Sequence, residues 1–91
     1  MDEFRKLVKP VTEDGREIRE VTMRRPIVND FLLLEQKNIK GQTARDVDMV
    51  SRLTGLLPTT VSQLDMRDYV WLSRKMQSFF EDDGSTEIAP L

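Results

Sequence analysis

Three close pairs of carboxylates are the side chains of this sequence best suited to carry chemistry. They are Asp46 with Asp48, Asp65 with Asp68, and Asp82 with Asp83. Two neighbouring carboxylates can serve as general acid and base when a concave site drives their pKa values apart, and they can hold a metal ion when further ligands converge. The sequence contains no histidine and no cysteine, which are common partners in such sites. We therefore expect a protein that is not an enzyme and that binds no metal ion and no cofactor.

Each of the first two pairs has a simpler structural interpretation. Asp46 and Asp48 would lie about 200° apart around a helix, so they cannot share a metal ion. Asp65 and Asp68 stand where a helix is expected to begin, which suits a helix cap and a complement to the helix dipole. The third pair belongs to an acidic run and is interpreted as solvated charge.

Length and charge narrow the class of protein further. The chain has 91 residues and a net charge of −2, with a pI of about 5.1. We expect one small domain over residues 1–80 and a flexible acidic tail over residues 81–91. The excess of acidic over basic residues disfavours nucleic-acid binding, because such binding needs clustered Lys and Arg facing the phosphates. No apolar run approaches the ~18 residues of a membrane-spanning helix, and residues 1–9 do not resemble a signal peptide. We expect a cytoplasmic protein with no nucleic-acid or membrane partner.

A β-hairpin is predicted between Phe4 and Arg24. Asp14-Gly15 suits a tight type I′ turn, because both positions tolerate a positive φ. A two-residue turn at this point predicts three cross-strand pairs: Val11 with Ile18, Lys9 with Glu20, and Val8 with Val21. Pro10 has no N–H to donate, so the first strand should be an edge strand or should be broken there.

Helices are predicted for the rest of the chain. Asn29 or Asp30 can cap a first helix that runs to about Ile39, and a second helix should end at Gly55 in a left-handed conformation. After Pro58 we expect a short turn or helix and then a longer helix that ends near Phe80. One face of this last helix is apolar and consists of Met66, Tyr69, Val70, Leu72, Met76, Phe79 and Phe80. The predicted fold is therefore α+β, an N-terminal β-hairpin followed by three or four α-helices.

Some apolar side chains exceed what one packing face of a helix can cover. Residues 31–34 place four large apolar side chains through about 300° of a helix circumference, so at least one must face outward. Trp71 projects about 140° away from Met66, off the apolar face of the last helix. Another part of the same domain can cover these residues, and equally they can contact a partner protein. We take Leu32, Leu33 and Trp71 as candidate partner-binding residues.

A succession of short motifs runs through most of the chain. Pro10, Gly15, Arg24, Pro26 and Asp30 form a P-x(4)-G…R-x-P-x(3)-D progression. Leu53-Thr54-Gly55-Leu56, then Leu64-Asp65 with Asp68, and finally Phe79-Phe80 follow it. This order and spacing resemble the small tail assembly chaperones of Mu-like and related contractile-tailed phages. The resemblance covers roughly residues 4–80 and rests on the succession of motifs rather than on any single one.

The resemblance implies a chaperone that binds the tape measure protein, keeps it soluble and assists tail-tube assembly. Its expected location is the host cytoplasm, and it would be absent from the mature virion. In similar phages a programmed ribosomal frameshift also yields a longer product with a second domain. Candidate partners are therefore the tape measure protein, a frameshifted form of this chain and a second copy of it. The alternative is a permanent structural component of the tail or baseplate. A small regulatory or nucleic-acid-binding protein fits the acidic charge poorly.

Overall fold

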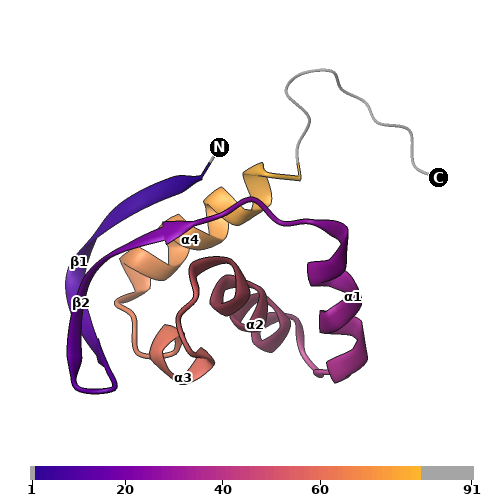
Figure 1. Ribbon diagram of the computed structural model, residues 1–91, viewed down its shortest axis with the longest axis horizontal. Helices are drawn as coiled ribbons and strands as arrows, with labels where there is room; N and C mark the ends of the chain where they lie inside the picture. Colours follow the sequence, from indigo (N-terminus) through magenta and orange to yellow (C-terminus); the bar gives the residue numbers. More distant parts are fainter. Residues whose placement is uncertain (1, 81–91) are drawn as a thin grey trace.

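Within residues 2–80 the chain forms an antiparallel β-hairpin followed by four helices (Figure 1). Figure 1 shows a computed structural model, and residues 2–80 are the ones that it describes. The elements are β1 (Glu3–Glu13), β2 (Arg16–Met23), α1 (Val28–Lys37), α2 (Gln42–Thr54), α3 (Pro58–Val61) and α4 (Met66–Ser78). The predicted α+β class is confirmed. The tail predicted for residues 81–91 lies outside the described residues, and the domain boundary at residue 80 stays a prediction.

Helix α2 forms the centre of the fold. It contacts α1, α3, α4 and strand β2, while α4 and α3 pack against β1 (Figure 1). The long curved hairpin lies along one side of the helices, and α1 lies at the other side (Figure 1). The core is a single apolar cluster to which both strands and all four helices, with the loops beside α3, contribute. Its buried members are Leu7, Val11, Val21, Met23, Leu34, Met49, Val50, Leu53, Leu56, Val61, Leu64, Leu72 and Met76.

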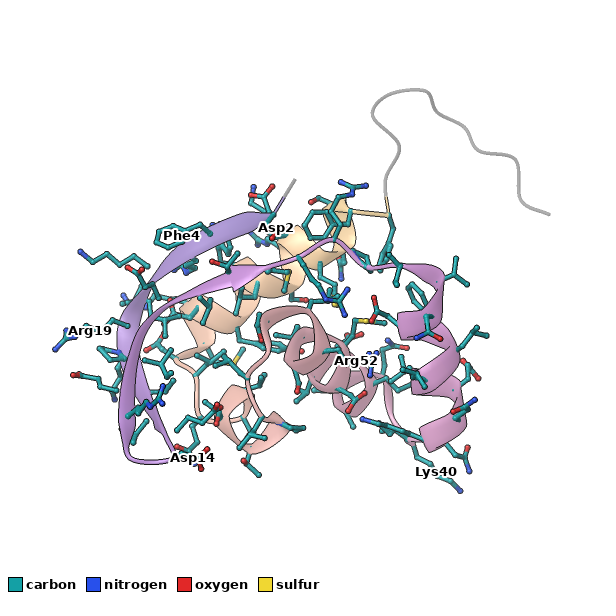
Figure 2. The ribbon with its side chains drawn as sticks, viewed as in Figure 1. Asp2, Phe4, Asp14, Arg19, Lys40 and Arg52 are labelled. Carbon is teal, nitrogen blue, oxygen red and sulfur yellow. The ribbon has the colours of Figure 1, made fainter. Side chains whose placement is uncertain are left out.

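The hairpin turn forms as its two residues predict. Asp14 and Gly15 both have positive φ, at 52° and 77°, and Val11 pairs with Ile18 on the adjoining strands. A turn with positive φ at both positions twists in the same sense as the strands, which keeps the hairpin paired. The outer face of the hairpin is open to solvent, and Figure 2 shows Phe4 and Arg19 pointing away from the helices.

Further from the turn, two of the predicted cross-strand pairs are wrong. Glu20 pairs with Lys6 rather than with Lys9, and Val21 pairs with Arg5 rather than with Val8. The register shifts between Lys6 and Val11, so β1 holds more residues than β2 along this stretch. Pro10 lies inside the shift, which confirms that the ladder is broken there.

The helix ends are set by local sequence, with one difference from expectation. Helix α1 begins after Ile27, so neither Asn29 nor Asp30 is its N-cap. Asp30 instead lies in the first turn and accepts the backbone N–H of Ile27, which is the second half of a capping box. Gly55 ends α2 with φ of 83°, as predicted. Asp65 caps α4 by accepting the N–H of Arg67 at 2.8 Å.

Only part of the apolar face predicted for α4 enters the core. Leu72 and Met76 are buried, whereas Met66 is 67% exposed and Val70 and Phe80 are also exposed. The hairpin and α2 cover the side of α4 that carries Leu72, because β1 and α2 contact this helix. Met66, Val70 and Phe80 are therefore left on the surface, whereas Tyr69 and Phe79 are half-buried against the core.

Candidate partner-binding surfaces

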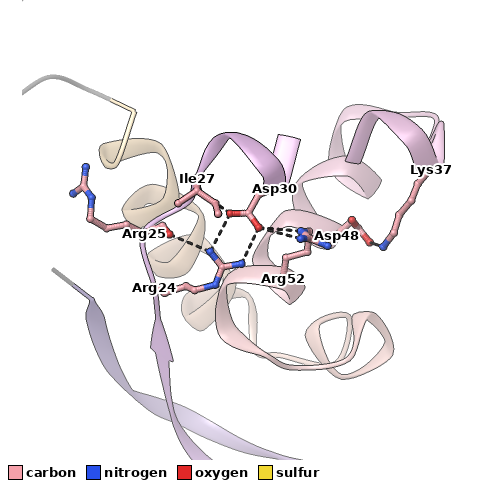
Figure 3. A network of polar contacts seen from close by, with 7 residues as sticks. All are labelled: Arg24, Arg25, Ile27, Asp30, Lys37, Asp48 and Arg52. Carbon is pink, nitrogen blue, oxygen red and sulfur yellow. Dashed lines mark hydrogen bonds and ion pairs between the residues drawn. The ribbon is translucent and has the colours of Figure 1, made fainter. Parts of the chain in front are cut away.

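A network of ion pairs fixes the start of α1 against the rest of the fold (Figure 3). Asp30 is 1% exposed, and Arg24 donates to its two carboxylate oxygens at 2.7 and 2.9 Å. Arg52 of α2 donates to Oδ1 at 3.1 and 3.2 Å, and the Ile27 N–H donates to Oδ2 at 2.8 Å. Because Arg24 directly follows β2, one buried carboxylate connects β2, α1 and α2.

The electrostatics of this carboxylate keep it ionised at neutral pH. Hydrogen bonding from Arg24 is the main cause that holds the pKa of Asp30 well below its ordinary value of 3.8. Burial opposes this effect, while the Ile27 N–H and Arg52 add to it. A carboxyl group that stays ionised far below neutral pH cannot donate a proton near pH 7. The network therefore fixes the position of α1 on the fold.

The other end of α1 is also attached to α2. Lys37 Nζ lies 2.9 Å from Asp48 Oδ1 (Figure 3), and Arg45 lies 2.8 Å from Glu35. The second oxygen of Asp48 is buried and has no hydrogen-bond partner among residues 2–80. These contacts hold one side of α1 against α2, so its other side is available to solvent or to a partner.

The free side of α1 carries a group of exposed apolar residues, which we term the α1 surface. Its members are Ile27, Val28, Phe31, Leu32 and Phe80. Val28 is 75% exposed and Leu32 is 55% exposed. The ring of Phe80, beyond the end of α4, lies 5.3 Å from that of Phe31, centroid to centroid, and so extends the surface. Exposed apolar groups of this kind in a small protein often mark a contact with another polypeptide.

The candidate residues on α1 differ in accessibility. Leu32 belongs to the α1 surface, which confirms that one of the four apolar residues 31–34 must face outward. Leu33 is half-buried, and Leu34 is part of the core. Sequence reasoning did not single out Val28, although it precedes Leu32 by one helical turn and so shares its face.

Trp71 lies on a different surface, the α4 groove. This groove has a volume of about 330 Å³ and is lined by Arg5, Met66, Arg67, Val70, Trp71 and Arg74. Trp71 is half-buried, and the Arg5 guanidinium carbon and Lys75 Nζ lie 5.2 and 5.4 Å from its ring centroid. No residue of α1 lines this groove. The structure therefore places Leu32 and Trp71 on two separate surfaces.

The two carboxylate pairs within residues 2–80 do not form a metal site, and Asp82 with Asp83 lies outside the described residues. Asp65 is a helix cap and Asp68 lies in the first turn of α4, as interpreted. Asp68 is in addition fully buried and accepts from Arg5 Nε at 2.9 Å, which the sequence did not predict. Asp46 accepts from Gln42 on α2, whereas Asp48 faces Lys37 on α1. Within residues 2–80 there is no group of three or more acidic side chains placed to hold a metal ion. None of the helices in these residues combines the length and apolar character needed to cross a membrane.

A small α+β fold with exposed apolar side chains on helices is typical of a domain that binds other proteins. Residues 5–81 match the model of a family described as phage tail assembly chaperone proteins, E, or 41 or 14, and the chain therefore belongs to this family. No curated protein and no solved structure matches the chain.

Proposed function

We propose that this phage tail assembly chaperone binds the tape measure protein and keeps it soluble until the tail tube assembles around it. Membership of the chaperone family supports a role with protein partners in tail assembly. The observation that supports direct contact with a client protein is the α1 surface, where Leu32 is 55% exposed and Val28 is 75% exposed. A long helical client offers apolar stripes at helical spacing, which an exposed apolar helix face can cover.

We assign the client contact to α1, with Leu32 at its centre and half-buried Leu33 beside it. The ion pairs of Asp30 and Asp48 support this assignment, because they hold both ends of α1 against α2 without using its outer face. The helix is thus presented as a rigid element. A rigid contact surface loses little conformational freedom when it binds.

Co-expression with the tape measure protein of the same phage tests this proposal. Leu32→Glu and, separately, Val28→Glu should lower the fraction of tape measure protein that stays soluble. The matched control is Phe4→Glu on the outer face of the hairpin, because Phe4 is 56% exposed and Leu32 is 55% exposed. Circular dichroism must show that each variant is folded. Full solubility of the client with both folded α1 variants would contradict the proposal.

The proposed place of action is the host cytoplasm, before the virion is complete. Mass spectrometry of purified virions separates this proposal from a permanent role in the tail or baseplate. Absence of the chain from virions supports the chaperone role, and recovery at a stoichiometry similar to that of tail proteins supports the structural role. A frameshifted longer form and self-association stay predictions, for which immunoblotting of infected cells and analytical ultracentrifugation are the direct tests.

A further inference from the structure

We infer that the α4 groove is a second binding surface, separate from the α1 surface, and that it accepts a partner helix whose apolar stripe is flanked by acidic residues. The groove lies between α4 and β1, because five residues of α4 and Arg5 of β1 line it. It follows α4 from Met66 to Arg74, a rise of about 12 Å at 1.5 Å per residue. That length matches about two turns of a docked helix.

The apolar part of the groove is accessible. Met66 is 67% exposed and Val70 is 36% exposed, and the half-buried indole of Trp71 lies next to them. Met66 and Val70 are one helical turn apart, so they form a stripe along α4. Methionine and tryptophan are both common at the centre of protein interfaces, where they adapt to or anchor an apolar partner.

The polar part of the groove is basic. Three of its six lining residues are arginines, namely Arg5, Arg67 and Arg74, and no acidic side chain of residues 2–80 lines it. This contrasts with the net charge of −2 of the whole chain. A groove with an apolar floor and a basic wall is complementary to a helix that carries Glu or Asp beside its apolar stripe.

The arginines differ in how free they are to bind. Arg5 pairs with buried Asp68 at 2.9 Å, and Arg67 pairs with Asp65 at 3.2 Å. Arg74 is exposed and has no ion-pair partner within residues 2–80. Arg74 is therefore the guanidinium that an acidic partner can engage without breaking an existing ion pair, while Arg5 is held in place by Asp68.

The test uses the single tryptophan of the full chain as its signal. Trp71 lies in the groove, so its emission should shift when the groove is filled. The probe is a synthetic amphipathic peptide of about 18 residues with a leucine stripe flanked by Glu, which is long enough to be helical. A second peptide carries Lys in place of every Glu. The Glu peptide should bind and shift the emission, with an affinity that falls as salt is added, and the Lys peptide should bind at least about tenfold more weakly.

Variants locate the binding. Val70→Glu and Arg74→Glu should each lower the affinity for the Glu peptide by about tenfold or more. Arg74→Glu should also make this affinity depend less on salt. Leu32→Glu on the α1 surface is the matched control and should bind the peptide as tightly as the original chain. Because this control affects only the surface assigned to the tape measure protein, failure of one proposal can be told from failure of the other.

Three kinds of result would overturn the inference. The first is equal affinity for the Glu and Lys peptides, or a Val70→Glu variant that binds unchanged. The second is binding that appears only after Glu81, Asp82, Asp83 and Glu87 are neutralised in the full chain, which would make the chain's own acidic segment the occupant. The third is a dimer that Val70→Glu converts to a monomer, which would make a second copy the occupant.

Discussion

The backbone N–H of Val8 donates a hydrogen bond to the Asp68 carboxylate, with 2.9 Å between the nitrogen and Oδ1, although the two residues are 60 positions apart. The same carboxylate accepts the N–H of Lys9 at 3.3 Å and Nε of Arg5 at 2.9 Å. The N–H groups of Val8 and Lys9 belong to the stretch in which the hairpin register shifts. A buried side chain of α4 thus takes the place of β2 as hydrogen-bond partner of β1 there.

Asp68→Asn should lower the free energy of unfolding by about 3 kcal/mol. It removes the charge that Arg5 and the two backbone donors share at a fully buried position, and breaking a buried ion pair leaves the partner uncompensated. The control is Asp65→Asn, three residues earlier, where the carboxylate is a helix cap near the surface and a clearly smaller loss is expected. Urea unfolding of both variants measures the difference. Equal losses of unfolding free energy would show that Asp68 stabilises the fold no more than a helix cap does.

The Asp30 network should make the stability of the protein depend on pH in the acidic range. Hydrogen bonding from Arg24 lowers the pKa of Asp30 in the folded state, so the stability that this group contributes is complete above about pH 5. It is lost progressively as the pH falls below about 4 towards the lowered folded-state pKa. Thermal unfolding at a series of pH values should therefore show a loss of stability below about pH 4.

Asp30→Asn tests the origin of that loss. The variant should be destabilised by about 3 kcal/mol at pH 7, because Arg24 and Arg52 are left adjacent without the buried charge between them. The gap between the variant and the original chain should then narrow as the pH falls below about 4. A gap that stays constant from pH 7 to pH 3 would mean that another group causes the acid sensitivity.

Leu34 and Leu32 provide a second matched pair on one helix. Leu34 is 4% exposed and belongs to the core, so Leu34→Ala should cost about 3 kcal/mol of unfolding free energy. Leu32 is 55% exposed, and Leu32→Ala should change stability by no more than about 0.5 kcal/mol. Chemical denaturation distinguishes the two. A large loss for Leu32→Ala would mean that Leu32 supports the fold rather than a partner contact.

Two helices end at a residue in the left-handed conformation, and substitutions at these two residues should change stability in opposite directions. Gly55 has φ of 83°, so Gly55→Ala should cost about 1 kcal/mol from backbone conformation alone, since a Cβ there meets nothing within 4 Å. Asn38 ends α1 at φ of 52°, and Asn38→Gly should be neutral or slightly stabilising, because glycine adopts this conformation without a steric cost. Melting temperatures of the two variants should move apart. A Gly55→Ala variant as stable as the original chain would contradict this account.

Part of the fold could be read from local sequence. The positive φ of Asp14 and Gly15, the end of α2 at Gly55 and the cap of α4 at Asp65 depend on a few neighbouring residues, so each was predictable. The outward position of Leu32 could also be predicted from the sequence. Four consecutive large apolar residues extend around more of the helix than one packing face can cover. Leu32 follows from such local geometry, whereas Val28 was not singled out and Phe80 joins the α1 surface from beyond α4.

Only the tertiary structure decided the rest. At the register shift in β1 the N–H of Val8 donates to Asp68, a partner that no local pattern connects to Val8. Arg24, Asp30 and Arg52 likewise meet only after β2, α1 and α2 have packed. The separation of Leu32 from Trp71, and the arginines that surround Trp71, depend on which face of α4 the hairpin covers. Periodicity determines which residues share a face of an element, but packing between distant elements determines which face is buried and which charged groups a buried carboxylate binds.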